Sequence, residues 1–317
     1  MSEQVFVGID IGGTTVKLSL MTTAGEMKKK WEIPTNLTHH GRYIVSEIAE
    51  SVQAELTNLV LRGVGVGAPA FIEMETGVVT QAVNLGWRDY PLKEAFTKAL
   101  NVPVFVDNDA NLAALGEMWR GAGDGSNEVL FVTLGTGVGG GIITRGQILH
   151  GVHGLGGEIG HITVMPDNGA PCNCGKRGCL ETVSSATGMA RLATEQLAAG
   201  KNSMLEKETV TTRHIFEAVE AGDALALNVV EQSTYYLGLA LANLANSLNP
   251  EKIVIGGGVS KAGEQLLGPL RKVFSQYAIP QVATHTEIKL ATLGNDAGMY
   301  GAVWLAQSNT AKQEVEQ

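Results

Sequence analysis

Residues 5–17, VFVGIDIGGTTVK, place a short apolar run directly before a turn rich in glycine and threonine. An unbroken apolar run of this length predicts a buried strand, and the glycines predict a tight turn at its end. Lys17–Met21 then predicts a returning strand. The same layout recurs at residues 129–140, VLFVTLGTGVGG. This repetition predicts two related halves of one fold.

Between these two stretches, strands alternate with helices. Apolar residues at helical spacing predict a helix at about 41–61, and strands are expected at 63–67 and 102–106. A helix is expected at 110–119. The glycine-rich segment 121–127 is the expected domain boundary.

The second half continues the alternation. We expect a helix at 223–248, a strand at 252–255, a further helix, and a strand near 287–291. A last helix is expected at 296–307, with the polar end 308–317 frayed. Alternating strands and helices predict an α/β protein.

Composition excludes several classes of protein. The 317 residues are 44% hydrophobic, carry a net charge of −9 and include 40 glycines. The acidic balance argues against a nucleic-acid partner, which would require a basic face. The most apolar helix candidate, 236–248, is too short to span a membrane. No signal peptide is visible, because Asp10 is reached without a basic start or a long apolar run. We therefore expect a cytoplasmic protein.

Glycine loops occur at 12–15, 135–141 and 256–258. Residues 135–140 match G-x-G-x-x-G, but a dinucleotide site needs these glycines to open a helix. Residues 141–149 predict a β-hairpin instead, and no P-loop motif occurs. Each loop could be an ordinary tight turn. Together they predict backbone anion sites that hold the β- and γ-phosphates of a nucleotide, with the third loop at the adenine.

The only cysteines are Cys172, Cys174 and Cys179. In a reducing compartment such a cluster favours metal binding over a disulfide, although a disulfide and free thiols stay open as alternatives. With His161 they predict a closed Cys₃His zinc site of the structural type. The neighbouring carboxylates Glu158 and Glu181 would then lie on a loop held by the metal.

Residues 107–109, Asp-Asn-Asp, follow an expected strand and precede an expected helix. Helix capping is one interpretation of any member of this trio. A phosphoryl-transfer base, which orients and deprotonates the attacking hydroxyl, is the other.

The motifs at 10–17, 134–140 and 172–181, in this order, resemble those of the ROK sugar kinases over essentially the whole chain. The resemblance implies a two-domain actin-like ATPase fold of the hexokinase type, with the active site in the interdomain cleft. It implies a smaller N-terminal domain at 1–120 and a larger domain at 121–295. The C-terminal segment, about 296–317, would pack back on the first domain.

The resemblance also implies the reaction. We expect ATP-dependent phosphorylation of the 6-hydroxyl of glucose, with Mg²⁺, a structural Zn²⁺ and a homodimer. A kinase for N-acetylmannosamine, mannose, allose or fructose is the alternative. A sugar-responsive ROK repressor is a third possibility. Such repressors carry an N-terminal helix-turn-helix, whereas only residues 1–4 precede the first expected strand here. The acidic net charge also disfavours a repressor.

The resemblance further assigns site residues. Asp109 would be the catalytic base. The expected sugar-binding residues are Gly67, Asn84, Asn108, Asp109, Glu158, His161 and Glu181. The expected residues for Mg·ATP are Asp10, Gly12, Gly13, Thr14, Thr15, Lys17, Thr136, Gly137, Gly139, Gly257 and Gly258. The expected metal ligands are His161, Cys172, Cys174 and Cys179.

Overall fold

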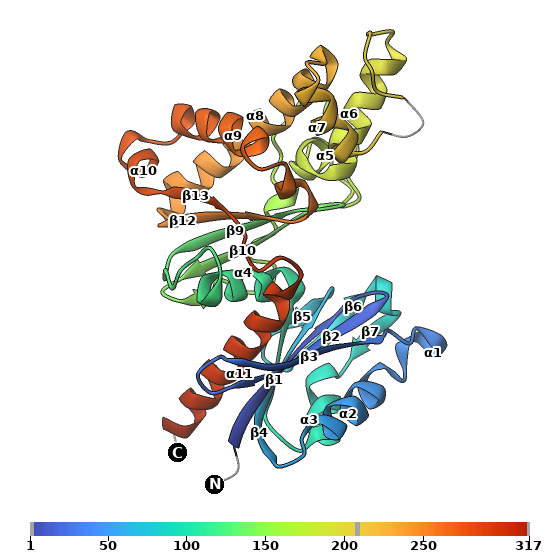
Figure 1. The fold of residues 1–317 in the computed structure, drawn as a ribbon, viewed down its shortest axis with the longest axis vertical. Helices are drawn as coiled ribbons and strands as arrows, with labels where there is room; N and C mark the ends of the chain where they lie inside the picture. Colours follow the sequence, from blue (N-terminus) through green and yellow to red (C-terminus); the bar gives the residue numbers. More distant parts are fainter. Residues whose placement is uncertain (1–2, 207–209, 316–317) are drawn as a thin grey trace.

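Two five-stranded sheets form the framework of the protein (Figure 1). The computed structural model describes residues 3–206 and 210–315. The first sheet has the order β3-β2-β1-β4-β8, with bounds Met27–Pro34, Thr15–Thr22, Glu3–Ile11, Leu59–Ala68 and Val104–Asn108. The second has the order β11-β10-β9-β12-β13, with bounds Gln147–Ile148, Val138–Thr144, Val129–Leu134, Lys252–Gly256 and Glu287–Leu290.

Both sheets have the same topology. In the first sheet, β1 pairs antiparallel with β2 and parallel with β4. In the second sheet, β9 likewise pairs antiparallel with β10 and parallel with β12. The expected β-hairpin after residue 140 is present as β10 and β11. The repeated strand order agrees with the two related halves predicted from residues 5–17 and 129–140.

Burial explains why the apolar runs form central strands. Val5, Val7 and Ile9 of β1 are fully buried, as are Leu130, Val132 and Leu134 of β9. Strands buried on both faces are continuous in apolar residues because helices or loops cover each side.

Helices and a small third sheet cover the framework. Near the first sheet lie α1 (Thr38–Gly41), α2 (Ile44–Glu55), α3 (Leu92–Leu100) and the sheet of β5 (Phe71–Glu73), β6 (Val78–Ala82) and β7 (Trp87–Tyr90). Beside the second lie α5 (Glu181–Ser184), α6 (Ala186–Ala198), α7 (Thr212–Glu220), α8 (Ala224–Leu248), α9 (Glu264–Tyr277) and α10 (Pro280–His285). Short 3₁₀ helices span Val83–Leu85, Ile159–His161, Gly258–Ala262 and Gly294–Asp296. Within the described ranges, no helix is long and apolar enough to cross a membrane.

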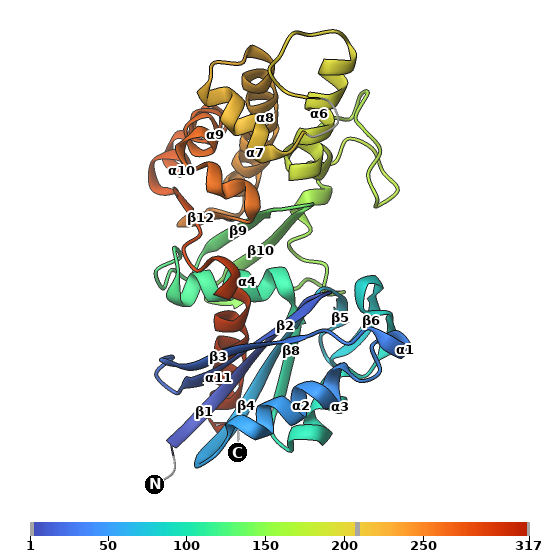
Figure 2. The same cartoon turned by 45° about the vertical axis from the view of Figure 1, so that its right-hand side comes forward.

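Two helices join the sheets. Helix α4 (Asp109–Arg120) lies between them, and α11 (Ala297–Val315) runs from α4 along the first sheet (Figures 1 and 2). The two helices pack closely because both have glycine at the contact. A Cβ on Gly116 would lie 2.0 Å from the Ala297 carbonyl oxygen, and one on Gly301 would lie 1.8 Å from that of Leu112.

Two sequence-based element bounds were wrong. The helix expected at 41–61 ends at Glu55, because Asn58 adopts a left-handed φ of 62° and β4 begins at Leu59. The end expected to fray from residue 308 continues as α11 to Val315. Its side chains are held by the first sheet, since Thr310 is buried and Glu314 forms an ion pair with Arg62.

Glu117 joins the two chain segments that cross between the sheets. It is fully buried on α4 and accepts the backbone N–H of Ala122, at 2.8 Å, on the outgoing segment. It also accepts the N–H groups of Thr292, at 3.1 Å, and Leu293, at 2.7 Å, on the returning segment. One carboxylate therefore satisfies buried donors on both crossings.

Glu117→Gln should destabilise the fold. The amide keeps one acceptor oxygen and turns an NH₂ group toward backbone donors, and each buried donor left unpaired costs about 1–3 kcal/mol. We expect the free energy of unfolding to fall by about 2–4 kcal/mol in urea titration. Glu264→Gln, at an exposed position paired with Arg271, is the control. Equal stability of Glu117→Gln and wild type would contradict this role.

Candidate functional site

The Asp107–Asn108–Asp109 trio lies where β8 ends and α4 begins. Asn108 is the N-cap of α4, since its side-chain oxygen accepts the N–H of Ala110 at 2.8 Å. Asp109 accepts the same N–H at 2.9 Å. Helix capping, one of the two interpretations of the trio, is therefore confirmed for Asn108. It leaves Asp109 with one carboxylate oxygen free of that bond.

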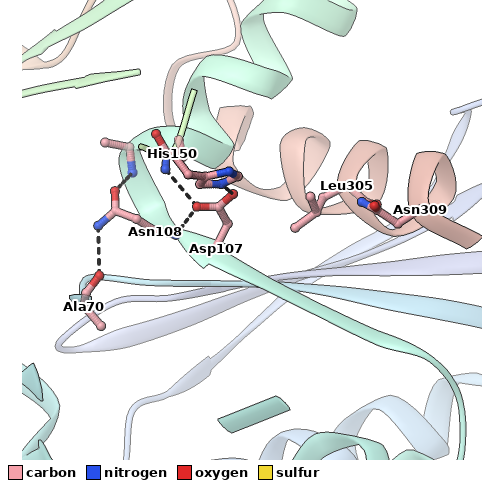
Figure 3. A network of polar contacts seen from close by, with 8 residues as sticks. Ala70, Asp107, Asn108, His150, Leu305 and Asn309 are labelled. Carbon is pink, nitrogen blue, oxygen red and sulfur yellow. Dashed lines mark hydrogen bonds and ion pairs between the residues drawn. The ribbon is translucent and has the colours of Figure 1, made fainter. Parts of the chain in front are cut away.

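Asp107 is enclosed by donors (Figure 3). Its Oδ1 accepts the N–H of Asn108 at 2.7 Å and the side-chain amide of Asn111 at 2.8 Å. Its Oδ2 lies 2.7 Å from Nε2 of His150. Asn108 in turn donates its side-chain amide to the carbonyl of Ala70 at 3.3 Å. These contacts fix the backbone that carries Asp109.

Two cavities meet at Asp109. The larger, of 540 Å³, is lined by Asp10, Lys17, Asp109, Glu158 and glycines of the 135–139 turn. The smaller, of 140 Å³, is lined by Asn108, Asp109, Glu158 and residues of β5. A carboxylate that borders both spaces can contact one molecule in each of them.

The two aspartates of the larger cavity are held largely out of water. Burial, with a smaller contribution from the nearby Asp109 charge, raises the pKa of Asp10 to about 6, while Lys17 opposes the rise. Burial also raises the pKa of Asp109, against the lowering effect of the Ala110 N–H. Both groups are consequently more basic than ordinary aspartates.

The turn at 135–139 lines this cavity, whereas the turn at 12–15 follows the strand of Asp10, which lines it. The N–H of Gly12 bonds to the Thr15 carbonyl at 3.0 Å, which closes the turn after β1. The N–H of Gly135 bonds to the Gly137 carbonyl at 3.0 Å, which closes the turn after β9. Both turns follow equivalent strands of the two sheets, as the shared topology requires.

Glu181 supports the second turn. Its Oε2 accepts the backbone N–H of Val138 at 3.1 Å. A Cβ on Gly137 would lie 2.3 Å from that oxygen, so only glycine fits there without displacing Glu181. The carboxylate thereby connects the 135–139 turn to the cysteine segment.

The four expected metal ligands lie together. One ligand atom from each of His161, Cys172, Cys174 and Cys179 falls within 4.8 Å of the others. Nδ1 of His161 is 3.6 Å from Sγ of Cys172, and the sulfurs of Cys174 and Cys179 are also 3.6 Å apart. That separation is too long for a disulfide, which needs about 2.05 Å between the sulfurs. Three thiols and an imidazole are a donor set that fits zinc.

The two ring nitrogens of His161 face different groups. With Nδ1 toward the sulfurs, Nε2 lies 3.8 Å from the carboxylate of Glu158 and borders the larger cavity. Metal on Nδ1 would leave the proton on Nε2. That N–H is then available to an acceptor in the cavity.

Other expected residues do not line either cavity. Gly67 is buried in β4, paired with Asp10 on one side and Asp107 on the other, and a Cβ there would lie 2.8 Å from the Leu112 side chain. Asn84 is exposed on the 3₁₀ helix 83–85, close to Gly13. The remaining ones sit on exposed or partly exposed turns at the ends of β1, β9 and β12: Gly12, Gly13, Thr14, Thr15, Thr136, Gly257 and Gly258.

Sequence reasoning missed two parts of the cavity lining and one contact behind it. Residues 70–72 and Met74 line the smaller cavity, and Gly294 with Asn295 line the larger. The contact behind the lining is that of His150 with Asp107. Only Gly294 and Gly298 left a sequence signal, as small residues at the start of the last helix. His150 gives no such signal, because it is a single histidine in a loop after a hairpin.

Comparisons with known proteins show similarity to one family along nearly the whole chain. The ROK family model matches residues 6–309. A protein named glucokinase from Halalkalibacterium halodurans is 56% identical over 99% of this chain and 98% of its own length.

Solved structures agree as well. A ROK hexokinase from Thermus thermophilus superposes with a TM-score of 0.83 at 31% identity, over 97% of this chain and 99% of that one. A ROK family glucokinase from Streptomyces griseus, in complex with glucose and AMPPNP, superposes with a TM-score of 0.76 at 34% identity, over 96% and 99%. The expected actin-like ATPase fold is confirmed, and the chain belongs to the ROK family.

Proposed function

We propose that the protein is a glucokinase that transfers the γ-phosphoryl group of ATP to the 6-hydroxyl of glucose. The position of Asp109, at the junction of a 540 Å³ cavity and a 140 Å³ cavity, carries this proposal. The similar proteins named glucokinase, and the relative complexed with glucose and AMPPNP, support it.

The larger cavity would hold the nucleotide. Backbone N–H groups of the Gly12–Thr14 and Gly135–Gly139 turns are suited to phosphate oxygens. Lys17 adds a positive charge, and Asp10 is the carboxylate suited to Mg²⁺. That ion, when bound with ATP, would neutralise charge on the phosphates. Thr15 and Thr136 are proposed to assist the phosphates, with Gly257 and Gly258 at the adenine.

The sugar would lie where the smaller cavity meets the larger one. Asn108 and Glu158 line the smaller cavity, and Glu158, His161 and Glu181 line the larger one. These four residues are proposed to bind the sugar hydroxyls, with Asn84 and the Gly67 strand at the periphery. Asn108 has already committed its side-chain oxygen to Ala110 and one N–H to Ala70, so its other N–H is the group left for the sugar.

Asp109 would act as the base. A carboxylate removed from water accepts a proton more readily, and burial has raised its pKa. It takes the proton of the primary hydroxyl as that oxygen attacks the γ-phosphorus. The bond from phosphorus to the bridging oxygen of ADP then breaks, and ADP departs with the electron pair.

The zinc site would hold the sugar side still. His161, Cys172, Cys174 and Cys179 would bind the ion, whose chemistry there is structural because all four positions are filled. The ion would fix the proton of His161 on Nε2, facing the cavity. The cysteines would thus orient sugar-binding groups without taking part in phosphoryl transfer.

Three further assignments belong to the proposal. We place the domain boundary near residue 120, with 1–120 and the C-terminal helix in one domain and 121–295 in the other. The protein is proposed to be a homodimer and to act in the cytoplasm. Another hexose as the preferred substrate is the alternative within the same mechanism.

An ADP-release assay with Mg·ATP and a panel of hexoses tests the function. We expect glucose to give the highest kcat/KM, and Asp109→Asn to lose about 10²–10⁴-fold in kcat, the range of a general base. Glucose affinity, measured by calorimetry, should be largely kept. A faster hexose would change the substrate alone, whereas no stimulation by any sugar would refute the kinase.

The pH profile tests the base. Asp109 works only when deprotonated, so kcat should fall as the pH decreases through its pKa. Since burial raises that pKa above the ordinary 3.8, the acid limb should begin at a higher pH than for an exposed aspartate. We would measure kcat at saturating Mg·ATP and glucose from neutral pH downward. A rate that stays constant down to pH 4 contradicts the assignment.

Removal of the metal tests the zinc site. We expect one zinc per chain by mass spectrometry of the purified protein. Chelation should lower the melting temperature and raise KM for glucose, while KM for ATP changes less, because the ligand segment lies on the sugar side. Glucose binding that is equal with and without metal would refute this account.

A further inference from the structure

We propose that His150 is a positioning residue for Asp109, acting through the buried carboxylate of Asp107. This inference rests on the proposed kinase function. His150 follows the β10–β11 hairpin and is the second residue of a loop, residues 149–157, that leads to Glu158. Nothing in its sequence context marks it, because it belongs to neither the metal motif nor a glycine turn.

The contact between the two side chains is short and shielded. Nε2 of His150 lies 2.7 Å from Oδ2 of Asp107, whose side chain is 1% exposed against 26% for the imidazole. A buried carboxylate needs donors for its oxygens, or its desolvation is uncompensated. Asn108 and Asn111 serve Oδ1, so His150 is the donor that serves Oδ2 (Figure 3).

Asp107, held in place by His150, in turn holds the N-terminal end of α4, where Asp109 lies. Through Oδ1 it holds the backbone N–H of Asn108 and the side chain of Asn111, which lie on either side of Asp109. If Oδ2 loses its donor, the carboxylate must turn toward water and release one of these bonds. Asp109 would then lose its fixed direction, and phosphoryl transfer depends on the alignment of the attacking oxygen.

His150 also holds the 149–157 loop, which forms part of the wall of the smaller cavity. Its backbone carbonyl accepts the N–H of Gly156 at 2.7 Å, which closes the 149–157 loop. Gly154 and Gly156 of this loop line the smaller cavity, and a Cβ on Gly154 would lie 2.8 Å from the Ile72 carbonyl of β5. One residue therefore sets the wall of the proposed sugar cavity relative to the base.

His150 also lines a separate cavity of 120 Å³, together with Leu115, Leu305 and Asn309 among others. Truncation of His150 would join this space to the position that the ring leaves. Free imidazole could then enter and donate to Asp107. This gives the proposal a chemical rescue as its test.

The first experiment compares His150→Gln, which keeps an N–H donor, with His150→Met, which has similar bulk and none. We expect His150→Met to lose about 10- to 100-fold in kcat with glucose, the scale of a misplaced reacting group. His150→Gln should stay within about threefold of wild type, since a neutral hydrogen bond replaces the original. KM for ATP should be unchanged in both, because the nucleotide groups are not touched.

The second experiment uses His150→Ala with and without imidazole in the buffer. Imidazole should raise kcat of this variant several-fold and leave wild type and Asp109→Asn unaffected. His153→Ala is the matched control, since His153 is exposed in the same loop and lines neither cavity. It should match wild type in kcat and show no response to imidazole.

Each contrary result has a distinct meaning. Equal kcat for His150→Met and wild type, equal losses in the Gln and Met variants, or no rescue of His150→Ala would overturn the positioning role. A KM for ATP that rises by the same factor as kcat falls would show general damage and also overturn it. A wild-type protein inactive with every hexose would instead refute the proposed function. Should His150→Ala not fold, the Gln and Met pair decides alone.

Discussion

The close packing of α4 against α11 is the contact on which the arrangement of the two sheets depends. Gly116 and Gly301 allow the backbones to touch, and each would collide with a carbonyl oxygen if it carried a Cβ. Because α4 also packs on β10 and α11 on β1 and β4, this contact fixes one sheet relative to the other. Glu117 then ties both crossing segments to the helix pair, and the larger cavity opens at the N-terminal ends of the two helices.

Four acids near this contact divide into two kinds. Asp107 and Glu117 each accept hydrogen bonds from several protein donors, so their role is to stabilise the fold. Asp10 and Asp109 are desolvated with fewer partners, and burial raises the pKa of both. A carboxylate that remains short of donors in a cavity is suited to a cation or a proton from a ligand. The acids that stabilise the fold are therefore fully buried and supplied with several donors, whereas Asp10 and Asp109 line the cavity with fewer donors.

Much of the framework could be predicted from local pattern. The apolar runs at β1 and β9 with their glycine turns define equivalent strands, and the spacing of the cysteines with His161 defines the metal cluster. What could not be predicted depends on contacts between distant segments. The continuation of α11 past residue 308 follows from its burial against the first sheet, which its polar sequence conceals. The pairing of His150 with Asp107 likewise requires a hairpin loop to meet a strand 43 residues earlier.

The cysteine segment illustrates why the cluster sits where it does. Glu181 lies two residues after Cys179 and accepts the N–H of Val138 in the 135–139 turn, while His161 faces the sulfurs with one nitrogen and the cavity with the other. A metal at the sulfurs would restrain both residues at once. The ion would bind His161 directly and would reach the Val138 turn only indirectly, through Glu181. In the proposed mechanism the sugar lies beside this imidazole, so a rigid cluster outside the cavity would orient the sugar without entering the chemistry.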